Sequence, residues 1–402
     1  MKKNIIIAGS GFAGLWSAIS AARAIALSES EDKVSVTVVS PKAHLVIRPR
    51  LYEATINGMD PDLTPLFKEL GIHHLAGVVK EIQADANKLI VESSDGHTQV
   101  MEYDKFILAA GSRLFSPNIP GLDKYAFNVD QIESAQKLEA HIGELANKPD
   151  LPARNTVVVV GGGLTGIETA SEMPNRLRKA FGEKVSVRVI IVDKASSIAP
   201  DMGPAPRPVI EEALMECGVE IITNTSVSSI DQNGITLSSG ERIDTLTVVW
   251  TGGGRANQLT EQIRGDKDDF GRVYADSYLR AKGEEDIFVT GDVAHVATDN
   301  EGNVALMSCQ HALSLGRVSG HNAAAELTGL SLHPYSQPKY VTCLDLGTWG
   351  AVYTEGWDRK VCLTRDEAKS LKIDITTKWI YPPTPERESV FAVANPDYVI
   401  VP

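Results

Sequence analysis

The sequence predicts an α/β fold with two Rossmann-like domains, the first of them discontinuous, and a C-terminal α+β region. Two observations predict it. A unit of apolar strand, glycine-rich turn, helix and second strand stands at the N-terminus, and the same unit recurs after residue 155. Repeated units of this kind build parallel sheets covered by helices. A later apolar strand, at residues 286–291, also ends in glycine.

The first unit begins with the run Asn-Ile-Ile-Ile-Ala at residues 4–8, which is typical of a buried parallel strand. The turn Gly-Ser-Gly-Phe-Ala-Gly follows at residues 9–14, then an Ala-rich helix to about Leu27 and a second strand at 34–39. The uncharged run up to Ala22 resembles a signal peptide or a membrane helix, but its glycine spacing favours strand, turn and helix.

The second unit has the same order of elements. A strand at 156–160 precedes the turn Gly-Gly-Gly-Leu-Thr-Gly at 161–166, a helix through about Arg178 and a strand at 185–192 that ends at Asp193. This internal duplication is the main organisational feature of the chain.

Between and after the two units the pattern is weaker. Residues 106–111 read as another strand that ends in glycine, and a helix is expected from Gly316 to about Leu327. Strand-like runs follow at 340–346 and 351–353, and a short helix is expected near Thr364, with Thr-x-x-Glu as its capping box. The proline-rich tail excludes a long amphipathic helix.

Composition favours a soluble, cytoplasmic protein. The chain has 402 residues, 43% apolar and 23% charged, ordinary values for a globular protein of two or three domains. Its formal net charge of -13 argues against nucleic acid and anionic membrane surfaces as partners, because both attract basic patches. Four scattered cysteines without CxxC spacing indicate reduced thiols, and no metal site is expected.

The glycine turns predict chemistry through backbone geometry. In each, the first glycine permits the tight turn, the second lets a pyrophosphate approach the backbone, and the third lets helix and strand pack closely. The helix N-terminus then offers unpaired N–H groups to the phosphates. A turn without ligand is the alternative, but the position between strand and helix favours two dinucleotides. Nicotinamide and flavin are the natural pair, since hydride passes from one ring to the other.

The residue after the second strand differs between the two units. Ser40 stands where an acidic residue normally binds a ribose hydroxyl, which weakens that contact. Asp193 stands at the matching position of the second unit, where its carboxylate accepts from both ribose hydroxyls and repels a 2′-phosphate. We therefore predict NADH rather than NADPH; a solvated aspartate at the strand end is the alternative.

The order of four motifs resembles that of the two-dinucleotide-binding FAD/NAD(P) flavoprotein superfamily. The motifs are Gly9-x-Gly11-x-x-Gly14, Ala109-Ala110-Gly111, Gly161-x-Gly163-x-x-Gly166 and Thr290-Gly291-Asp292. The resemblance implies FAD on the first domain, NADH on the second, and a hydrogen bond from the ribityl chain of FAD to the carboxylate of Asp292. It implies an FAD-binding domain in two parts (1–120 and 285–330), an NAD-binding domain (121–284) and a C-terminal region (331–402).

Within this superfamily the chain is most similar to type II NADH dehydrogenases, single-subunit NADH:quinone reductases. The likeness covers about residues 1–330 and rests on residues 44–53, 161–168, 250–257 and 309–316. The last stretch resembles the family's Ala-Gln-x-Ala-x-Gln-x-Gly, which lies beside the flavin and lines the quinone site. Gln310 matches the first glutamine of that motif, whereas Ser314 replaces the second.

Two further positions have competing interpretations. Glu168 matches a family glutamate near the nicotinamide and is predicted to be catalytic together with Gln310; alternatively, Thr165-x-x-Glu168 is a helix capping box. Arg48 and Arg50 either neutralise FAD phosphates or are solvated, and we favour Arg48.

The predicted cofactor contacts form two sets. For FAD they are Gly9, Gly11, Phe12, Ala13, Gly14, Ser40, Arg48, Val79, Ala110, Gly111, Gly291, Asp292, Gln310 and His311. For NAD they are Gly161, Gly163, Leu164, Thr165, Gly166, Glu168, Asp193, Gly252 and Gly253.

The expected activity is that of an NADH-dependent flavoprotein oxidoreductase. Disulfide and sulfide:quinone reductases need a cysteine pair near the flavin, and the first cysteine here is Cys217. Flavin monooxygenases carry an FxGxxxHxxxW element that is missing from this sequence. Membership of the ferredoxin reductases is not excluded by these motifs. We expect a quinone as the small-molecule acceptor.

Two alternatives to the quinone reductase stay open. One is a soluble NADH-dependent flavoprotein reductase or oxidase with a non-quinone acceptor (a small molecule, oxygen or a redox protein). The other is a non-catalytic redox-state interaction protein. The tail lacks the amphipathic helices by which family members lie on a bilayer, so membrane contact is expected to be peripheral at most. A homodimer stays open.

Overall fold

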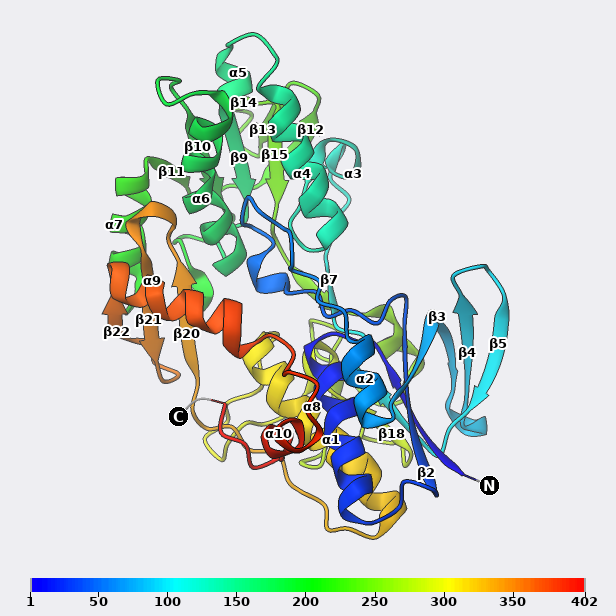
Figure 1. The fold of residues 1–402 in the computed structure, drawn as a ribbon. Helices are drawn as coiled ribbons and strands as arrows, with labels where there is room; N and C mark the ends of the chain where they lie inside the picture. Colours follow the sequence, from blue (N-terminus) through cyan, green and yellow to red (C-terminus); the bar gives the residue numbers. More distant parts are fainter. Residues whose placement is uncertain (1, 401–402) are drawn as a thin grey trace.

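The structure is a computed structural model that describes residues 2–400. It has two lobes, each built on a sheet with parallel strands, and a C-terminal layer along one side (Figure 1). The first lobe, at the bottom of Figure 1, holds both the N-terminal strands and the late helix α8. The second lobe, at the top, is made from the middle of the chain.

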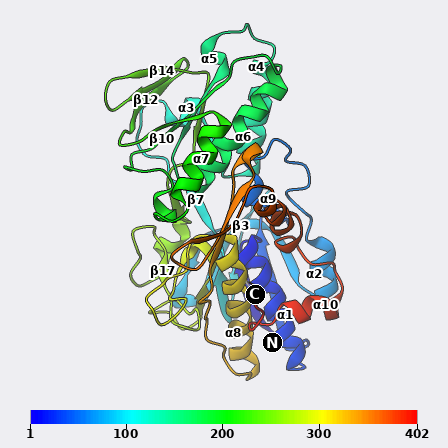
Figure 2. The same cartoon turned by 90° about the vertical axis from the view of Figure 1, so that its left-hand side faces the viewer.

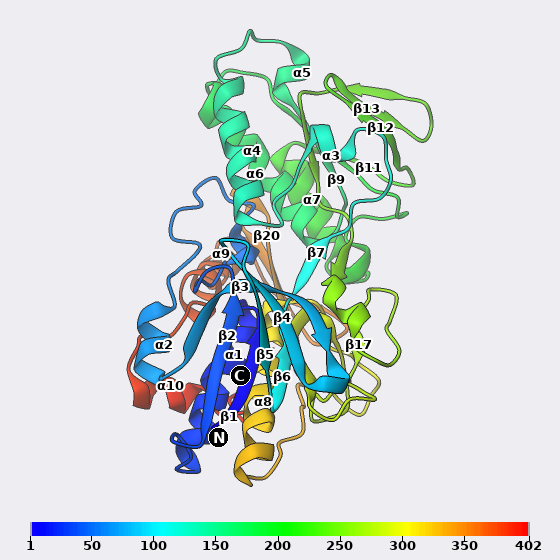
Figure 3. The ribbon, with the colours of Figure 1, turned by 90° about the vertical axis from the view of Figure 1, so that its right-hand side faces the viewer.

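The first lobe contains a seven-stranded sheet with the order β18-β6-β1-β2-β3-β4-β5. Its strands are β1 (Lys3–Ala8), β2 (Val34–Ser40), β3 (His73–Gln83), β4 (Lys88–Ser93), β5 (Thr98–Glu102), β6 (Lys105–Leu108) and β18 (Ile287–Val289). Neighbours from β18 to β3 pair in parallel, whereas β4 and β5 extend β3 as an antiparallel meander (Figure 3). Because β18 pairs with β6, the chain returns to this lobe after forming the other one.

The second lobe contains a parallel five-stranded sheet with the order β11-β10-β9-β15-β8. Its strands are β8 (Ala126–Phe127), β9 (Thr156–Val160), β10 (Arg188–Val192), β11 (Val219–Ile222) and β15 (Thr247–Trp250). The strand predicted at 185–192 is three residues too long, because Val185 N–H donates to the carbonyl of Gly182 and closes a turn there.

Small sheets complete the fold. An antiparallel sheet of three strands lies in the second lobe, a two-stranded ribbon joins the lobes, and a short pair lies in the first lobe. These strands are β12 (Val227–Asp231), β13 (Gly234–Leu237), β14 (Arg242–Asp244), β7 (Ser112–Leu114), β16 (Gly254–Ala256), β17 (Val273–Tyr274) and β19 (Ala294–His295).

Ten α-helices are described. They are α1 (Phe12–Leu27), α2 (Thr64–Leu70), α3 (Leu122–Tyr125), α4 (Ile132–Leu145), α5 (Pro152–Asn155), α6 (Leu164–Phe181), α7 (Arg207–Cys217), α8 (Cys309–Thr328), α9 (Arg365–Asp374) and α10 (Arg387–Val393). Within residues 2–400, no helix has the length and apolar character needed to cross a membrane.

The helices α1 and α8 pack against each other at very short distance. A Cβ added to Gly320 would lie 2.0 Å from the carbonyl oxygen of Ser17, and one added to Gly316 would lie 2.5 Å from that of Ala13. The prediction that this helix starts after Gly316 was wrong. It starts at Cys309, where the Ser308 side chain accepts a hydrogen bond from the N–H of His311 and caps it. Gly316 is therefore a packing residue inside the helix.

The C-terminal layer connects the lobes. It consists of the antiparallel strands β20 (Val341–Asp345), β21 (Ala351–Glu355) and β22 (Lys360–Thr364), with α9 packed on them (Figure 2). The strand β22 was not predicted. Helix α9 begins beside Thr364 as predicted, but the expected capping box is absent, since Thr364 makes no side-chain cap hydrogen bond. The short helix α10 packs on α1, and Ser20 Oγ donates to the carbonyl of Ala394 at 3.1 Å.

An aromatic stack attaches this layer to α8. The ring of His311 stacks on Tyr340 at 4.9 Å between centroids, and Tyr340 stacks on Trp357 at 5.0 Å. The imidazole is fully buried, and burial, together with the nearby charges of Arg359 and Arg272, lowers the pKa of His311 to about 3. The imidazole is therefore neutral in the folded protein.

The lowered pKa of His311 should be visible in the pH dependence of the protein's stability. Because its pKa in the fold lies below the ordinary 6.5, the unfolded chain binds more protons in this window. Stability should therefore fall as the pH drops from 6.5, by up to about 1.4 kcal/mol per pH unit from this residue. In urea unfolding, His311→Gln should show a shallower loss of stability toward pH 4; equal slopes in variant and parent would contradict the assignment.

Candidate active site

The first glycine turn has the geometry of an anion cradle. Gly9 has a φ of +110°, which favours glycine, and a Cβ added to Gly14 would lie 2.0 Å from the carbonyl oxygen of Gly9. A Cβ added to Gly11 would meet no atom within 4 Å. The first and third glycines are therefore required by the fold, whereas the second opens onto free space at the N-terminus of α1.

The second glycine turn repeats this geometry. Gly161 has a φ of +118°, and a Cβ added to Gly166 would lie 1.8 Å from the carbonyl oxygen of Gly161. Gly163, at the N-terminus of α6, again has no atom within 4 Å of an added Cβ. The turn also touches the loop after β15, since an added Cβ at Gly161 would lie 3.1 Å from the backbone N of Gly252.

The residues at the two strand ends are held differently. Ser40 is buried, donates from Oγ to the carbonyl of Lys42 at 2.7 Å, and lies 3.0 Å from Nε2 of His74. The hydroxyl proton of Ser40 is therefore used inside the protein.

Asp193 carries a carboxylate that already serves the backbone. Its Oδ2 accepts from the N–H of Gly162, in the glycine turn, and its Oδ1 accepts from the N–H of Ala195 at 2.6 Å. One lone pair remains on each oxygen, so the carboxylate can also accept from two ribose hydroxyls.

The Gly-Asp motif after β18 lies against the first glycine helix. Gly291 has a φ of +68°, and a Cβ added there would lie 2.7 Å from that of Ala13. Asp292 accepts from Ser112 Oγ at 2.6 Å and lies 3.7 Å from Nη1 of Arg48. Three parts of the chain therefore converge here: the start of α1, the strand β7 and the 3-10 turn Gly291–Val293 after β18.

The two arginines considered for FAD phosphates are both paired internally. Arg48 bonds Asp130 and also donates to Ser112 Oγ at 3.3 Å, which keeps it beside Asp292. Arg50 binds both carboxylate oxygens of Glu53, at 2.8 and 2.7 Å. The interpretation of both as solvated residues was wrong, and only Arg48 lies next to the Gly-Asp motif.

The first turn of α8 carries unsatisfied polar groups. Nδ1 of His311 accepts from the backbone N–H of Leu306 at 3.3 Å, so the proton of the neutral ring is on Nε2. That Nε2 is buried without a hydrogen-bond partner, as is Nε2 of Gln310. Burial raises the pKa of the Cys309 thiol, so this cysteine is protonated. Two orphaned donors at a helix N-terminus fit a ligand with hydrogen-bond acceptors.

Glu168 lies in a buried ion pair. Its Oε1 accepts from Lys372 Nζ at 2.6 Å and from the N–H of Asp345 at 3.1 Å. Burial raises the pKa of Glu168, while Lys372 opposes the shift; the attraction of Glu168 outweighs burial at Lys372 and raises the pKa of that lysine to about 12. The capping-box alternative was wrong, because α6 is capped at Gly163 without a side-chain bond.

Around this pair lies a network that sequence reasoning missed. Lys369 Nζ bonds both carboxylate oxygens of Asp345, at 2.6 and 2.7 Å, and Tyr52 donates to the same carboxylate at 3.1 Å. The network joins the first lobe, helix α6 and the C-terminal layer. The only available signal was the spacing of Lys369 and Lys372 by one helical turn, which by itself indicates no partner.

The remaining predicted residues surround the two turns. Phe12 lies at the start of α1, Val79 is buried in β3, and Leu164 is 36% exposed at the start of α6. Asn257, after β16, binds the carbonyls of Ala110 and Gly111. Among the described residues, no hydrogen bond joins Glu168 to Gln310.

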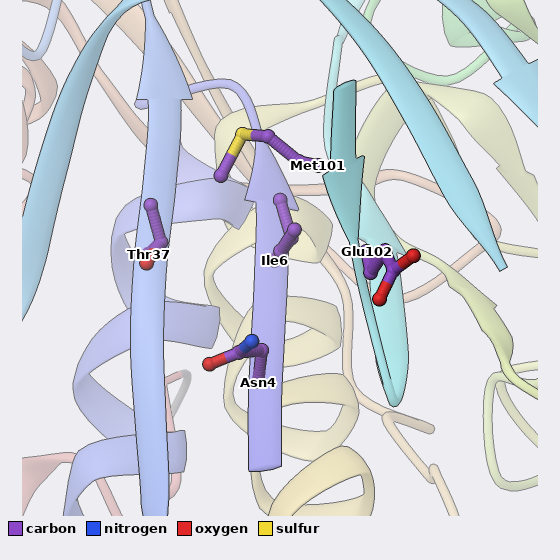
Figure 4. Close-up of a pocket in the computed structure, with 5 residues that line it drawn as sticks. All are labelled: Asn4, Ile6, Thr37, Met101 and Glu102. Carbon is purple, nitrogen blue, oxygen red and sulfur yellow. The ribbon is translucent and has the colours of Figure 1, made fainter. Parts of the chain in front are cut away.

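A hollow of about 270 Å³ lies elsewhere. It is lined by Asn4, Ile6, Thr37, Met101 and Glu102, which face one another across β1, β2 and β5 (Figure 4). Because the glycine turn follows the last residue of β1, this hollow near Asn4 is not part of the turn.

Comparisons with known proteins agree with this geometry. A family model described as pyridine nucleotide-disulphide oxidoreductase matches residues 3–316. The chain is 43% identical to an NADH dehydrogenase-like protein of Mycobacterium tuberculosis (strain CDC 1551 / Oshkosh), over 98% of either chain. It is 29% identical to the type II NADH:quinone oxidoreductase Ndh of M. tuberculosis (strain ATCC 25618 / H37Rv), over 73% of this chain and 68% of that protein.

Among solved structures, NDH2 from Plasmodium falciparum in complex with NADH has the same fold. Its TM-score is 0.78 at 14% identity, over 98% of this chain and 97% of that one. The comparisons confirm the resemblance and the α/β fold class predicted from the sequence. They also show that this protein is an NADH-dependent oxidoreductase whose cofactors are FAD and NADH. The chain belongs to the pyridine nucleotide-disulphide oxidoreductase family, among its NADH dehydrogenase-like members.

Proposed function

We propose that this protein is an NADH:quinone oxidoreductase that binds FAD at the first glycine turn and NADH at the second. The observation that carries the proposal is the matched pair of turns, in which Gly11 and Gly163 alone open onto free space at helix N-termini. A pyrophosphate needs this combination of free space and convergent N–H groups. When bound, FAD supplies a ring that accepts hydride from NADH and passes electrons to the acceptor.

The first lobe would bind FAD through its pyrophosphate and its ribityl chain. The backbone N–H groups after Gly11 would bind the phosphates, and Asp292, held by Ser112 and Arg48, would accept from the ribityl hydroxyls. His311 and Gln310 would offer their unpaired N–H groups to the flavin. Ser40 can accept a hydrogen bond from the adenosine ribose but has no proton left to donate.

The second lobe would hold NADH through Gly163 and Asp193. Asp193 would accept from the ribose hydroxyls with its free lone pairs, and its charge would disfavour a 2′-phosphate. Glu168, held in place by Lys372, would lie on the same helix that binds the pyrophosphate and keep a charged group ordered beside the reacting rings.

The quinone as acceptor is supported by the relatives and by Gln310. The type II relative from M. tuberculosis is an NADH:quinone oxidoreductase by name, and Gln310 stands at the first glutamine of the family motif. One observation favours a second candidate, an NADH-dependent reductase or oxidase with a non-quinone acceptor. Ser314, a buried and shorter residue, replaces the second glutamine, which removes an amide from this part of α8.

An acceptor screen tests the proposal. Purified protein loaded with FAD should oxidise excess NADH with a water-soluble quinone in steady turnover, faster than with oxygen or ferricyanide alone. Turnover with oxygen or a redox protein but not with quinones would support the second candidate. A colourless protein that binds neither FAD nor NADH would contradict both.

Substituting each of the two open glycines by alanine should affect the binding of one cofactor and not of the other. Gly11→Ala should fold normally, because the added Cβ meets no protein atom, but should lose FAD affinity by at least about tenfold, since the methyl group occupies the pyrophosphate space. Gly163→Ala should stay yellow and lose NADH affinity instead. Flavin content and NADH titration measure the two effects; loss of FAD from the Gly163 variant would reverse the assignment.

Breaking the buried ion pair should cost stability and shift the pH profile. Lys372→Met leaves the carboxylate of Glu168 uncompensated, so the free energy of unfolding should fall by about 3–5 kcal/mol. The Glu168→Gln/Lys372→Met double variant should recover most of this loss. In the single variant the pKa of Glu168 rises further, so the acidic limb of NADH oxidation should move to higher pH.

The matched control is Lys378→Met, because the side chain of Lys378 is 69% exposed and pairs with Asp374 on the surface. It should leave stability and the pH profile almost unchanged. An unshifted acidic limb in Lys372→Met would show that Glu168 has no part in turnover.

A further inference from the structure

The ribbon of β7 and β16 brings two arginines together between the lobes. The chain leaves the first lobe through β7 and comes back from the second through β16 (Figures 1 and 3). The antiparallel register sets Arg113 directly opposite Arg255. Directly opposed residues project from the same face of a ribbon, with Cβ atoms about 4.5–5.5 Å apart.

This pair of like charges is not neutralised by the protein. Both arginines are exposed, and in the part of the chain that the structure describes neither guanidinium group forms a salt bridge or donates a hydrogen bond. Exposed arginines elsewhere, such as Arg188 with Glu220 and Arg242 with Asp231, have acidic partners. Like charges directly opposite each other destabilise a sheet. Two guanidinium groups from the same face of the ribbon, without acidic partners in a chain of net charge -13, are therefore free to bind an external anion.

The aromatic ring of Phe115 supports one member of the pair, Arg255. Arg255 lies with its Cζ 4.7 Å from the ring centroid, and the ring is 42% exposed. The N–H of Phe115 donates to the carbonyl of Gly253 at 2.5 Å, and its carbonyl accepts from Trp250 Nε1 at 3.0 Å. Stacking uses the face of a guanidinium and leaves its N–H edge free for a bidentate contact.

The arginines do not face the proposed FAD site. Ser112, the neighbour of Arg113 along β7, projects from the opposite face of the ribbon and donates there to Asp292. Since FAD is proposed to lie on the side of Asp292, the arginine face needs a different ligand.

We propose that Arg113, Arg255 and Phe115 form a binding site for a soluble phosphate-bearing anion of the nucleoside diphosphate type, on the face of the ribbon opposite to Asp292 and the proposed FAD site. A diphosphate carries enough charge and enough oxygens to occupy both guanidinium groups in bidentate fashion. Its base would have the exposed ring of Phe115 as a neighbouring apolar surface. Because the two arginines belong to the two strands that join the lobes, such a ligand would link these strands directly.

Calorimetric titration of the FAD-loaded protein with ADP and with inorganic pyrophosphate tests this site, with saturating NAD⁺ present to fill the dinucleotide site. One further site is expected for both probes. Arg113→Gln and Arg255→Gln should each weaken it by at least about tenfold, because each removes a charged bidentate contact. The control Arg188→Gln removes the same charge from the surface and should leave the binding constant unchanged.

Absence of binding, or equal binding by the parent and both variants, would overturn the proposal. Binding to phosphatidic acid vesicles without binding to either soluble probe would overturn it as well, by assigning the patch to a lipid surface. Flavin content and NADH oxidation, measured on the same samples, should not change in the three variants, so the result is independent of the proposed reductase activity.

Discussion

Both lobes depend on one constraint, the approach of a helix to a strand end at a distance that only glycine permits. An added Cβ at Gly14 or Gly166 would lie 2.0 or 1.8 Å from the carbonyl oxygen of the first glycine in the same turn. This approach fixes the N-terminus of each helix above the carboxyl end of a central parallel strand. Unpaired N–H groups therefore converge beside Gly11 and Gly163, the positions that stay open. The proposed binding of phosphates at these turns therefore needs only the backbone packing and no charged side chain.

Much of the fold could be predicted because its signals are local. An apolar run, a glycine spacing and a helix lie within some thirty residues in each unit, and β1, α1, β9 and α6 occur where these patterns indicate. The start of α8 could not be predicted in this way. Gly316 looks like a helix boundary in the sequence, and only its partner Ala13, on a helix about three hundred residues earlier, identifies it as a packing glycine.

The site was predictable only where a motif marks it. Asp292 and Asp193 follow strands, and the structure gives each a hydrogen-bonded position beside a glycine helix or turn. The environment of Glu168 was not predictable, because Lys372 and Asp345 come from a region with no recognisable pattern. Side chains that meet across three parts of a fold leave no periodic trace in the sequence.

The discontinuity of the first lobe has a consequence for biosynthesis. The sheet of the second lobe is formed from residues 126–250, a contiguous stretch, so it can fold as soon as that stretch has left the ribosome. The sheet of the first lobe lacks its edge strand until β18 is made, and α1 is uncovered until α8 and α10 reach it, the latter through Ser20 and Ala394. The face of the N-terminal helix that α8 and α10 cover is thus among the last surfaces to be buried, and nascent chains expose it until the C-terminal part of the chain is made.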